Sequence, residues 1–313
     1  MAWFDIPALY RYRRQVLSLD SALMLTRGNP LGWAALFAQL RTNRGTYTNV
    51  LPSADGLPPI FGQVNFQQGE RSARVAFIAP ESESILSALP LLLEDLAKQS
   101  GEWGAYHLLA EMDEASPAFD AFRRAGFSVF AWQRIWKLPS VEGNTLTGND
   151  WSPANLDQES SIRSLFQALL PPLVLSAEPI PAHTFTGLAC QQDGEVTAYT
   201  DVEFGPSGIY LRPIFHPDAV DVDSLIRELA GILPNQSKRP VYVAVRSYQS
   251  WLENGLQKIG AEAAPRQALL VKHLIAKQRS PILERGLQAL EHRRAEPSSP
   301  MARADSNSLQ GKN

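Results

Sequence analysis

One segment of this chain occurs twice, in diverged form, about 134 residues apart. The first copy runs from Gly104 to Leu138 and the second from Lys238 to Leu274. Each copy has the pattern of a buried apolar strand, a short helix, a glycine and then a long strand. Two copies of one unit predict that the chain is built from two similar parts.

The copies align best when their glycines are matched. Placing Gly126 on Gly260 also brings Gln133 onto Gln267 and sets two apolar strands in register. A glycine at this position is typical of the residue that follows a helix, where a left-handed backbone is needed. The alignment therefore predicts a helix end, followed by a strand, in each half.

The repeat predicts two tandem domains, and the length of 313 residues suits two domains of ordinary size. We assign residues 1–138 to an N-terminal domain and residues 155–275 to a C-terminal domain. Residues 139–154, rich in Gly, Pro, Asn, Ser and Thr, are predicted to be a linker. Residues 276–313 are predicted to form a short helix and a disordered tail.

Hydrophobic periodicity predicts an α/β protein in which each half forms its own mixed sheet. In the first half, Pro90 means that the main helix is either kinked or begins later than Glu81. The predicted first-half strands cover 47–51, 59–67, 72–78, 106–112 and 128–138, with helices over 81–100 and 118–125. The predicted second-half strands cover 186–191, 196–204, 208–215, 240–245 and 266–274, with helices over 158–170, 222–233 and 248–259.

This order of elements, together with the segment FRRAGF from Phe122 to Phe127, resembles the GCN5-related N-acetyltransferase superfamily. In that family an aromatic residue, a variable triplet and Gly-Phe end a helix. The second half carries a weaker version in KIGAEAAPRQALLVKHL. The resemblance implies two tandem acyl-CoA N-acyltransferase-like domains, acetyl-CoA as the acyl donor, and a small amine or a protein amine as the acceptor.

The resemblance also implies where an acyl donor would lie. In the family, two neighbouring parallel strands splay apart, and the pantetheine arm occupies the gap like an additional strand. In the first half these strands would be Ser72–Ile78 and Tyr106–Met112. The pyrophosphate would rest on backbone amides at the start of the next helix, approached through a glycine-rich loop.

The sequence departs from the family at that loop. The first half has no glycine there and places Glu81 and Glu83 where a pyrophosphate would lie. The second half also lacks glycine and carries Asp218, Asp221 and Asp223. Carboxylates at these positions repel phosphate, so a second hypothesis stays open: a catalytically degenerate module that binds a ligand or a partner.

The position of the family's tyrosine acid is also changed. Phe122 occupies it in the first half and Leu256 in the second, and neither side chain has a proton to donate. The residues therefore support the fold more strongly than they support acetyl transfer.

The strongest polar group of residues follows a predicted strand of the second half. Arg246 is an anion-binding fork, Ser247 can cap a helix beginning near Tyr248, and the Tyr248 hydroxyl is a candidate acid. Arg212 and His216, at the end of another strand, would face the same cleft. We predict cofactor binding by Arg246, Ser247, Arg212 and His216; the alternative is a surface arginine with a helix cap and a loop histidine.

Glu111 is the catalytic candidate of the first half. With Asp113 and Glu114 it ends a predicted strand, where a carboxylate could deprotonate an amine through water. The alternative, which we favour, is a solvated turn. Trp251 lies near Leu252 in a short predicted helix, and we expect it to be part of the core.

Composition excludes several functions. A net charge of −3 and a pI of about 6.0 give no basis for nucleic-acid binding. The single Cys190 rules out an internal disulfide, and no histidine spacing predicts a metal site. No apolar stretch is long enough to span a bilayer and the N-terminus lacks a signal-peptide pattern, so a cytoplasmic location is predicted.

Overall fold

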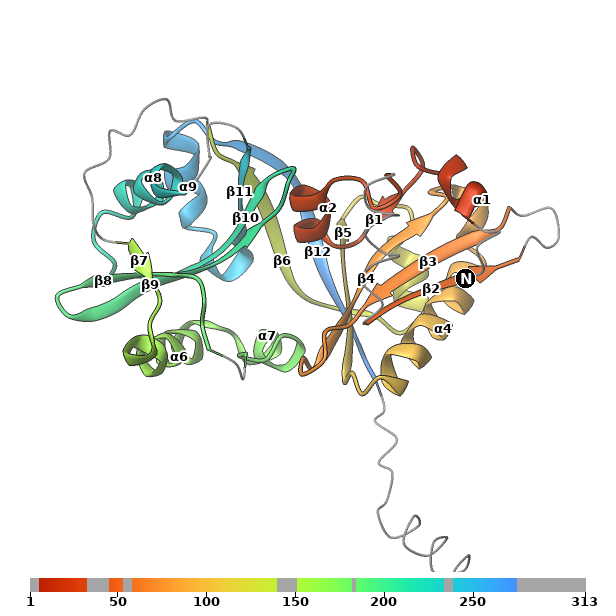
Figure 1. Cartoon of the computed structure of the whole chain (residues 1–313), viewed down its shortest axis with the longest axis horizontal. Coiled ribbons are helices and arrows are strands. Elements are labelled where there is room, and N and C mark those ends of the chain that lie inside the picture. Colours follow the sequence, from red (N-terminus) through yellow and green to blue (C-terminus); the bar gives the residue numbers. More distant parts are fainter. Residues whose placement is uncertain are drawn as a thin grey trace, which may run out of the picture. The chain divides into compact units, whose positions relative to one another are not determined.

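In the computed structural model, the described residues form a mixed sheet of twelve strands that runs through both halves of the chain (Figure 1). The structure describes residues 6–32, 45–52, 58–139, 151–181, 184–233 and 239–274. Residues 1–276 form one compact unit, and the second unit, 277–313, lies outside the described residues, as do most of the predicted linker and tail. The mixed α/β class is confirmed.

The first half begins with two short helices and a two-residue strand. The strands that follow lie within about two residues of their predicted positions. The elements are α1 (Ile6–Arg11), β1 (Leu17–Ser18), α2 (Ser21–Arg27), β2 (Thr46–Leu51), β3 (Ile60–Asn65), β4 (Ser72–Ala79), α4 (Leu89–Glu102), β5 (His107–Asp113), α5 (Phe119–Arg124) and β6 (Ser128–Lys137).

The second half follows the same order. Its strands and main helices were predicted, whereas β7 and α7 were missed. The elements are β7 (Trp151–Pro153), α6 (Glu159–Leu169), α7 (Pro172–Ala177), β8 (Leu188–Gln192), β9 (Glu195–Phe204), β10 (Ile209–Phe215), α8 (Val222–Ile232), β11 (Val241–Arg246), α9 (Leu252–Lys258) and β12 (Glu262–His273).

Helix α4 settles the question raised by Pro90. The helix begins at Leu89, so Pro90 lies in its first turn, where the missing amide has no intrahelical partner to lose. A short 3₁₀ turn, Glu83–Ile85, precedes it. The helix therefore starts later than Glu81 and is not kinked at the proline.

The final strands of the two halves are exchanged within the sheet. The strand order is β2-β3-β4-β5-β12-β6-β11-β10-β9-β8-β7, so β12 lies between β5 and β6. Beyond β12 the next strands are β5 and β4, and beyond β6 the next strands are β11 and β10. In both directions these next two strands are a parallel pair that belongs to the other half of the chain. The prediction of two separate sheets is wrong, because each half's last strand pairs with the other half.

The aligned glutamines meet at the centre of this arrangement. Gln133 of β6 and Gln267 of β12 are direct register partners, and Gln133 Nε2 donates a hydrogen bond of 2.8 Å to Gln267 Oε1. The two residues that the repeat places at equivalent positions are thus in contact. Derivation of the two halves from one duplicated unit stays a prediction.

Each face of the sheet is covered by a different set of helices. Along β5, Leu108 packs with α4 and α5, whereas the next residue, Leu109, packs with α6 and α7. This alternation is the two-residue period of a strand. Helices α8 and α9 cover the second half on the same face as α4 and α5, and α2 joins α6 and α7 on the opposite face.

Both predicted helix-ending glycines are in the left-handed region. Gly126 has φ +84° after α5 and Gly260 has φ +80° after α9. In each case the amide of the residue after the glycine closes the turn: Phe127 N donates to Phe122 O at 3.1 Å, and Ala261 N donates to Leu256 O at 3.0 Å. The sequence alignment therefore placed equivalent helix ends correctly.

Trp251 is not part of the core, and its prediction is wrong. Its side chain retains 39% exposure, whereas Leu252 and Leu256 are buried. Those two leucines are four residues apart, so they share the buried face of α9. Trp251 precedes Leu252 by one residue and is rotated about 100° from that face.

We therefore expect Leu256→Ala to lower the free energy of unfolding by about 2–5 kcal/mol, because it opens a cavity at a fully buried position. Trp251→Ala should cost about 1 kcal/mol or less. Urea denaturation of the two variants measures this difference. Equal losses would show that Trp251 contributes to the core after all.

Candidate functional site

A cleft with a volume of about 1700 Å³ opens on the sheet face that α2, α6 and α7 partly cover. We call it the central cleft, because strands of both halves line it. Its walls include α2, the β3–β4 turn and the segment after α7. Tyr199, Tyr210 and Leu109 contribute apolar surface to the cleft, and several charged side chains also line it.

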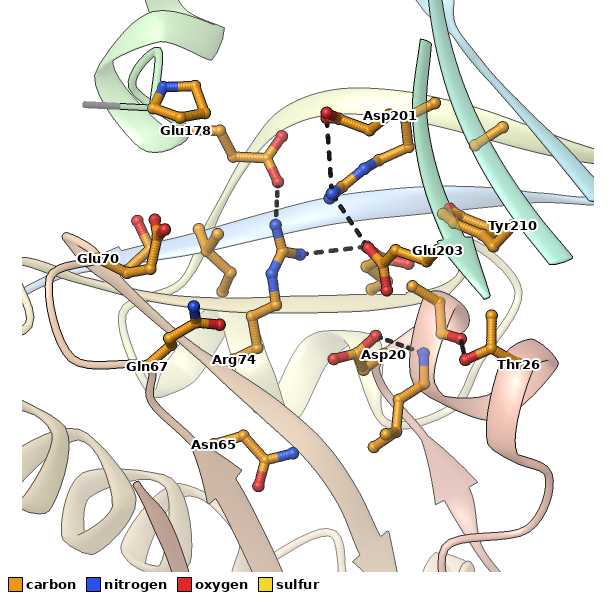
Figure 2. Close-up of a pocket in the computed structure, with 18 of the residues that line it drawn as sticks. Asp20, Thr26, Asn65, Gln67, Glu70, Arg74, Glu178, Asp201, Glu203 and Tyr210 are labelled. Carbon is orange, nitrogen blue, oxygen red and sulfur yellow. Dashed lines mark hydrogen bonds and ion pairs between the residues drawn. The ribbon is translucent and has the colours of Figure 1, made fainter. Parts of the chain in front are cut away.

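Four charged residues form a chain across the floor of this cleft. Arg74 of β4 contacts Glu178, after α7, with 2.6 Å between Nη2 and Oε1. Arg246 of β11 contacts the other oxygen of Glu178 at 3.2 Å. Arg74 Nη1 lies 3.4 Å from Oε1 of Glu111. Figure 2 shows the contact between Arg74 and Glu178, which is an ion pair between the two halves of the chain.

The two guanidinium groups control the ionisation of Glu178. Burial opposes the charged form, but Arg246 and Arg74, with Arg212 further away, outweigh it and lower the pKa of the carboxyl to about 2. Glu178 was not among the predicted site residues, since it follows an unpredicted helix and matches no motif.

Glu111 is buried, with only 6% of its surface exposed, so the favoured interpretation as a solvated turn is wrong for this residue. Its Oε2 accepts from Ser21 N at 3.2 Å and from Gln133 Nε2 at 2.9 Å. With Arg74 on Oε1, each carboxylate oxygen already has at least one donor. This saturation favours a structural role, and a role as a base stays a prediction. Asp113 is half-buried at the strand end, and Glu114 is exposed.

Arg212 faces two carboxylates on the neighbouring strand. Its Nη2 lies 3.0 Å from Glu203 and 3.7 Å from Asp201, and Asp201 also accepts a hydrogen bond of 2.8 Å from the Tyr199 hydroxyl. Burial, together with the Asp201 charge, raises the pKa of Tyr199. Tyr199, Asp201 and Glu203 are alternate residues of β9, so they lie on one face of the strand. The two acids were not predicted as site residues, and this two-residue spacing is the sequence signal that could have identified them.

Asp20 is a further carboxylate in the cleft that sequence reasoning missed. It caps α2, since its Oδ1 accepts from Leu23 N at 3.0 Å. Burial raises its pKa; the charge of Arg74 opposes that rise, and the charges of Glu111 and Glu203 add to it. Figure 2 shows Asp20, Arg74 and Glu203 pointing into one space.

Four of the predicted site residues line the central cleft: Arg246, Arg212, Tyr248 and Glu111. Arg246 is buried, so its alternative interpretation as a surface arginine is wrong. Burial raises the pKa of the Tyr248 hydroxyl, although the charge of Arg246 opposes this rise. Roles for these residues in cofactor binding and catalysis stay predictions.

Ser247 and His216 lie elsewhere. Ser247 begins a 3₁₀ turn without a side-chain cap, so its predicted capping role is wrong; its exposed hydroxyl instead accepts from Trp132 N at 3.4 Å. His216 Nδ1 accepts from the Asp218 amide at 3.2 Å. Neither residue belongs to the cleft lining.

The parallel strands of the second half separate after three paired positions, the last of which is Leu211 with Val243. Ile209 N donates to Pro240 O, so odd-numbered residues of β10 present their backbone groups to β11. Position 213 would be the next donor, and proline has no amide hydrogen. Pro213 therefore ends the pairing, and the gap beyond it, lined by Ala244, belongs to the central cleft.

The corresponding gap of the first half is filled by the chain itself. Strands β4 and β5 also pair at only three positions. Beyond them, Leu17 and Ser18 pair antiparallel with β4. Leu19 N donates to Ala76 O at 3.0 Å, and Leu19 O accepts from Glu111 N at 2.9 Å. The segment Leu17–Leu19 thus hydrogen-bonds to both separated strands.

Among the residues that the structure describes, no group of three or more His, Cys, Asp and Glu side chains could hold a metal ion. Cys190 is buried. No helix in the described part of the chain is long and apolar enough to cross a membrane.

Comparison with known proteins gives structural similarity only. No family model and no curated protein sequence matches the chain. Among solved structures, a tandem GNAT protein from the clavulanic acid biosynthesis pathway is 12% identical, with 86% of this chain and 95% of that chain covered and a TM-score of 0.49. A GCN5-related N-acetyltransferase from Sphaerobacter thermophilus is also 12% identical, with coverages of 77% and 84% and a TM-score of 0.49.

A functionally unknown conserved protein from Staphylococcus epidermidis is 11% identical, with coverages of 68% and 91% and a TM-score of 0.48. These TM-scores are too low to carry an argument. The fold and the site therefore rest on the strand pairings and contacts described above.

The lowered pKa of Glu178 predicts a pH-dependent contribution to stability. Because its pKa falls from the ordinary 4.5 to about 2 on folding, the ionised carboxylate stabilises the fold above pH 4.5. That contribution, on the order of 3 kcal/mol, is lost as the pH falls from 4.5 towards 2. Glu178→Gln should lower the free energy of unfolding by a similar amount at neutral pH and by little at pH near 2.

Chemical denaturation of wild type and Glu178→Gln across this pH range measures the effect. Asp218→Asn is the matched control, since the Asp218 side chain is 89% exposed. A wild-type advantage that stays constant with pH would contradict the assignment of charge pairing to Glu178.

Proposed function

We propose that this protein is an acyl-CoA-dependent N-acyltransferase whose second half binds the acyl donor. The observation that carries the proposal is the separation of β10 and β11 at Pro213, which leaves backbone edges facing the central cleft. In the residues that the structure describes, no chain segment is hydrogen-bonded between these two strands in the way that Leu17–Leu19 is between β4 and β5.

An extended ligand could bind in this gap as an additional strand. Because Val241 O accepts from Leu138 N, odd-numbered residues of β11 face β6 and even-numbered ones face β10. The carbonyl of Ala244 and the amide of Arg246 therefore lie on the separated edge, as partners for an amide-containing arm such as pantetheine. Arg246 also places its side chain in the cleft.

The chemistry would be acyl transfer to an amine. The amine nitrogen forms a bond to the thioester carbonyl carbon, the carbon–sulfur bond breaks, and the thiolate takes up a proton. The protein's part is to place the two reactants and to hold the proton leaving the amine. Cleft carboxylates such as Asp20, with its raised pKa, suit that second task. An acetyl group and a cytoplasmic setting follow only from the resemblance and the sequence.

A noncatalytic binding module is the second candidate, and one observation favours it. Asp221 caps α8 from a left-handed backbone at φ +50°, and Asp223 lies in the first turn of the helix. Carboxylates at the start of this helix repel a pyrophosphate. Under this alternative the same cleft binds a ligand without transferring a group.

Acetyl-CoA at about 100 times its dissociation constant should add roughly 2.7 kcal/mol to stability, and raise the melting temperature by roughly 5–10 °C. Amide hydrogen exchange should show protection in residues 214–216 and 244–248. Residues 75–80 should be unchanged, because Leu17–Leu19 already occupies that edge of β4.

Thermal melts and exchange mass spectrometry, with coenzyme A lacking the acyl group alongside, make this measurement. No shift at millimolar acetyl-CoA would remove the acyl-donor assignment and leave the binding module. Protection confined to residues 75–80 would show that the acyl donor binds to the first half, and would contradict the proposal that it binds to the second.

A further inference from the structure

Arg246 is a buried cation with one ion pair, to Glu178, among the described residues. Its side chain is only 9% exposed, and its contact with Glu178 is made through Nη2 alone. Glu178 is shared with Arg74, at the shorter distance of 2.6 Å. Arg246 Nη1 is buried and has no hydrogen-bond partner among the described residues. Burying a donor without a partner is unfavourable, which points to a ligand for this atom.

The opposite charge is in excess around Asp20. Arg212 Nη2 lies 3.7 Å from Asp201 and 3.0 Å from Glu203, so this cation is shared between two carboxylates. Asp20 adds a third carboxylate; among the described residues it accepts a hydrogen bond from the Leu23 amide, and it shares the charge of Arg74 with Glu178 and Glu111. Glu203 and Asp20 come from different halves of the chain, yet each is close enough to repel the charge of the other.

The same cleft therefore contains a guanidinium with an unpaired donor, at Arg246, and carboxylates that share their cations with other acids, at Asp20 and Glu203. A simple anion such as phosphate would satisfy Arg246 and be repelled by the carboxylates. A polyamine would satisfy the carboxylates and leave Arg246 unpaired. A molecule that carries both charges satisfies both groups.

We propose that the central cleft binds a small zwitterion of the α-amino-acid class, with its carboxylate toward Arg246 and its ammonium group toward Asp20 and Glu203. Its use as the acyl acceptor rests on the proposed function, because the ammonium nitrogen would then be the group acylated. Binding of the zwitterion itself does not depend on acyl transfer. It identifies the amine substrate as one that also bears a carboxylate.

Calorimetric titration of the full chain with the free L-α-amino acids, one at a time and without acyl-CoA, tests the proposal. For the tightest binder, the amide derivative removes the carboxylate and the N-acetyl derivative removes the cation. We expect each derivative to bind roughly 30-fold more weakly or worse, since each leaves a buried charge unpaired.

Two variants assign the contacts. Asp20→Asn keeps a good helix cap but removes the charge, and Arg246→Gln removes the guanidinium. Both should weaken binding by roughly 30-fold or more. Asp120→Asn and Arg123→Gln, exposed on α5 outside the cleft, are the matched controls and should bind as wild type does. If Arg246→Gln has a melting temperature well below that of the wild type, Arg246→Lys and Asp20→Asn are used for the test instead.

The proposal is overturned if no amino acid binds, if the amide binds as tightly as the free acid, or if Asp20→Asn binds like wild type. The outcome is separate from that of acetyl-CoA binding. Protection of residues 244–248 by acetyl-CoA without any amino-acid binding would leave the acyltransferase proposal standing and sink this one. Amino-acid binding without acetyl-CoA binding would support this proposal and contradict the acyltransferase proposal.

Discussion

The pairing of β6 with β12 is the interaction on which the rest of this structure depends. Each of these strands ends one half of the chain and completes the sheet of the other half. Because β12 lies between β5 and β6, neither half has a continuous sheet of its own. The hydrogen bond between Gln133 and Gln267 lies on this seam. The exchange also brings cleft residues of both halves onto one sheet face, where Arg74 and Arg246 share Glu178.

The two halves share a strand order but differ at the point that matters for function. In the first half, Leu17–Leu19 hydrogen-bonds to both separated strands. In the second half, Pro213 removes the donor that would have continued the parallel pairing, and the gap belongs to the central cleft. This asymmetry leaves the gap of the second half open to the central cleft, whereas the gap of the first half is occupied by the chain itself.

Much of the fold could be predicted from local signals. The apolar strands, the helix ends at Gly126 and Gly260 and the order of elements all leave patterns within a short window of sequence. The exchange of β6 and β12 could not be predicted in this way, because it depends on which distant strand each one pairs with. Both arrangements bury the same apolar faces, so the hydrophobic pattern does not distinguish them.

The site was predictable only in part, for the same reason. Arg246, Arg212 and Tyr248 follow or belong to recognised strands, and the structure brings them into one cleft. Asp20 and Glu178 come from segments without a motif. Their importance arises from burial beside charges that are distant in sequence, as the effect of Arg246 and Arg74 on the pKa of Glu178 shows.

The most direct test of this account is a crosslink between the exchanged strands. Register partners in an antiparallel pair have Cα atoms about 4.5–5.5 Å apart, which a disulfide can bridge. In a Cys190→Ser background, Gln133→Cys with Gln267→Cys should oxidise to a crosslink within one chain, detected by a gel shift reversed on reduction. Gln133→Cys with Val271→Cys, whose register partner is Ser128, should not. Failure of the first pair to crosslink within the chain, under conditions where both thiols react, would contradict the exchange of β6 and β12.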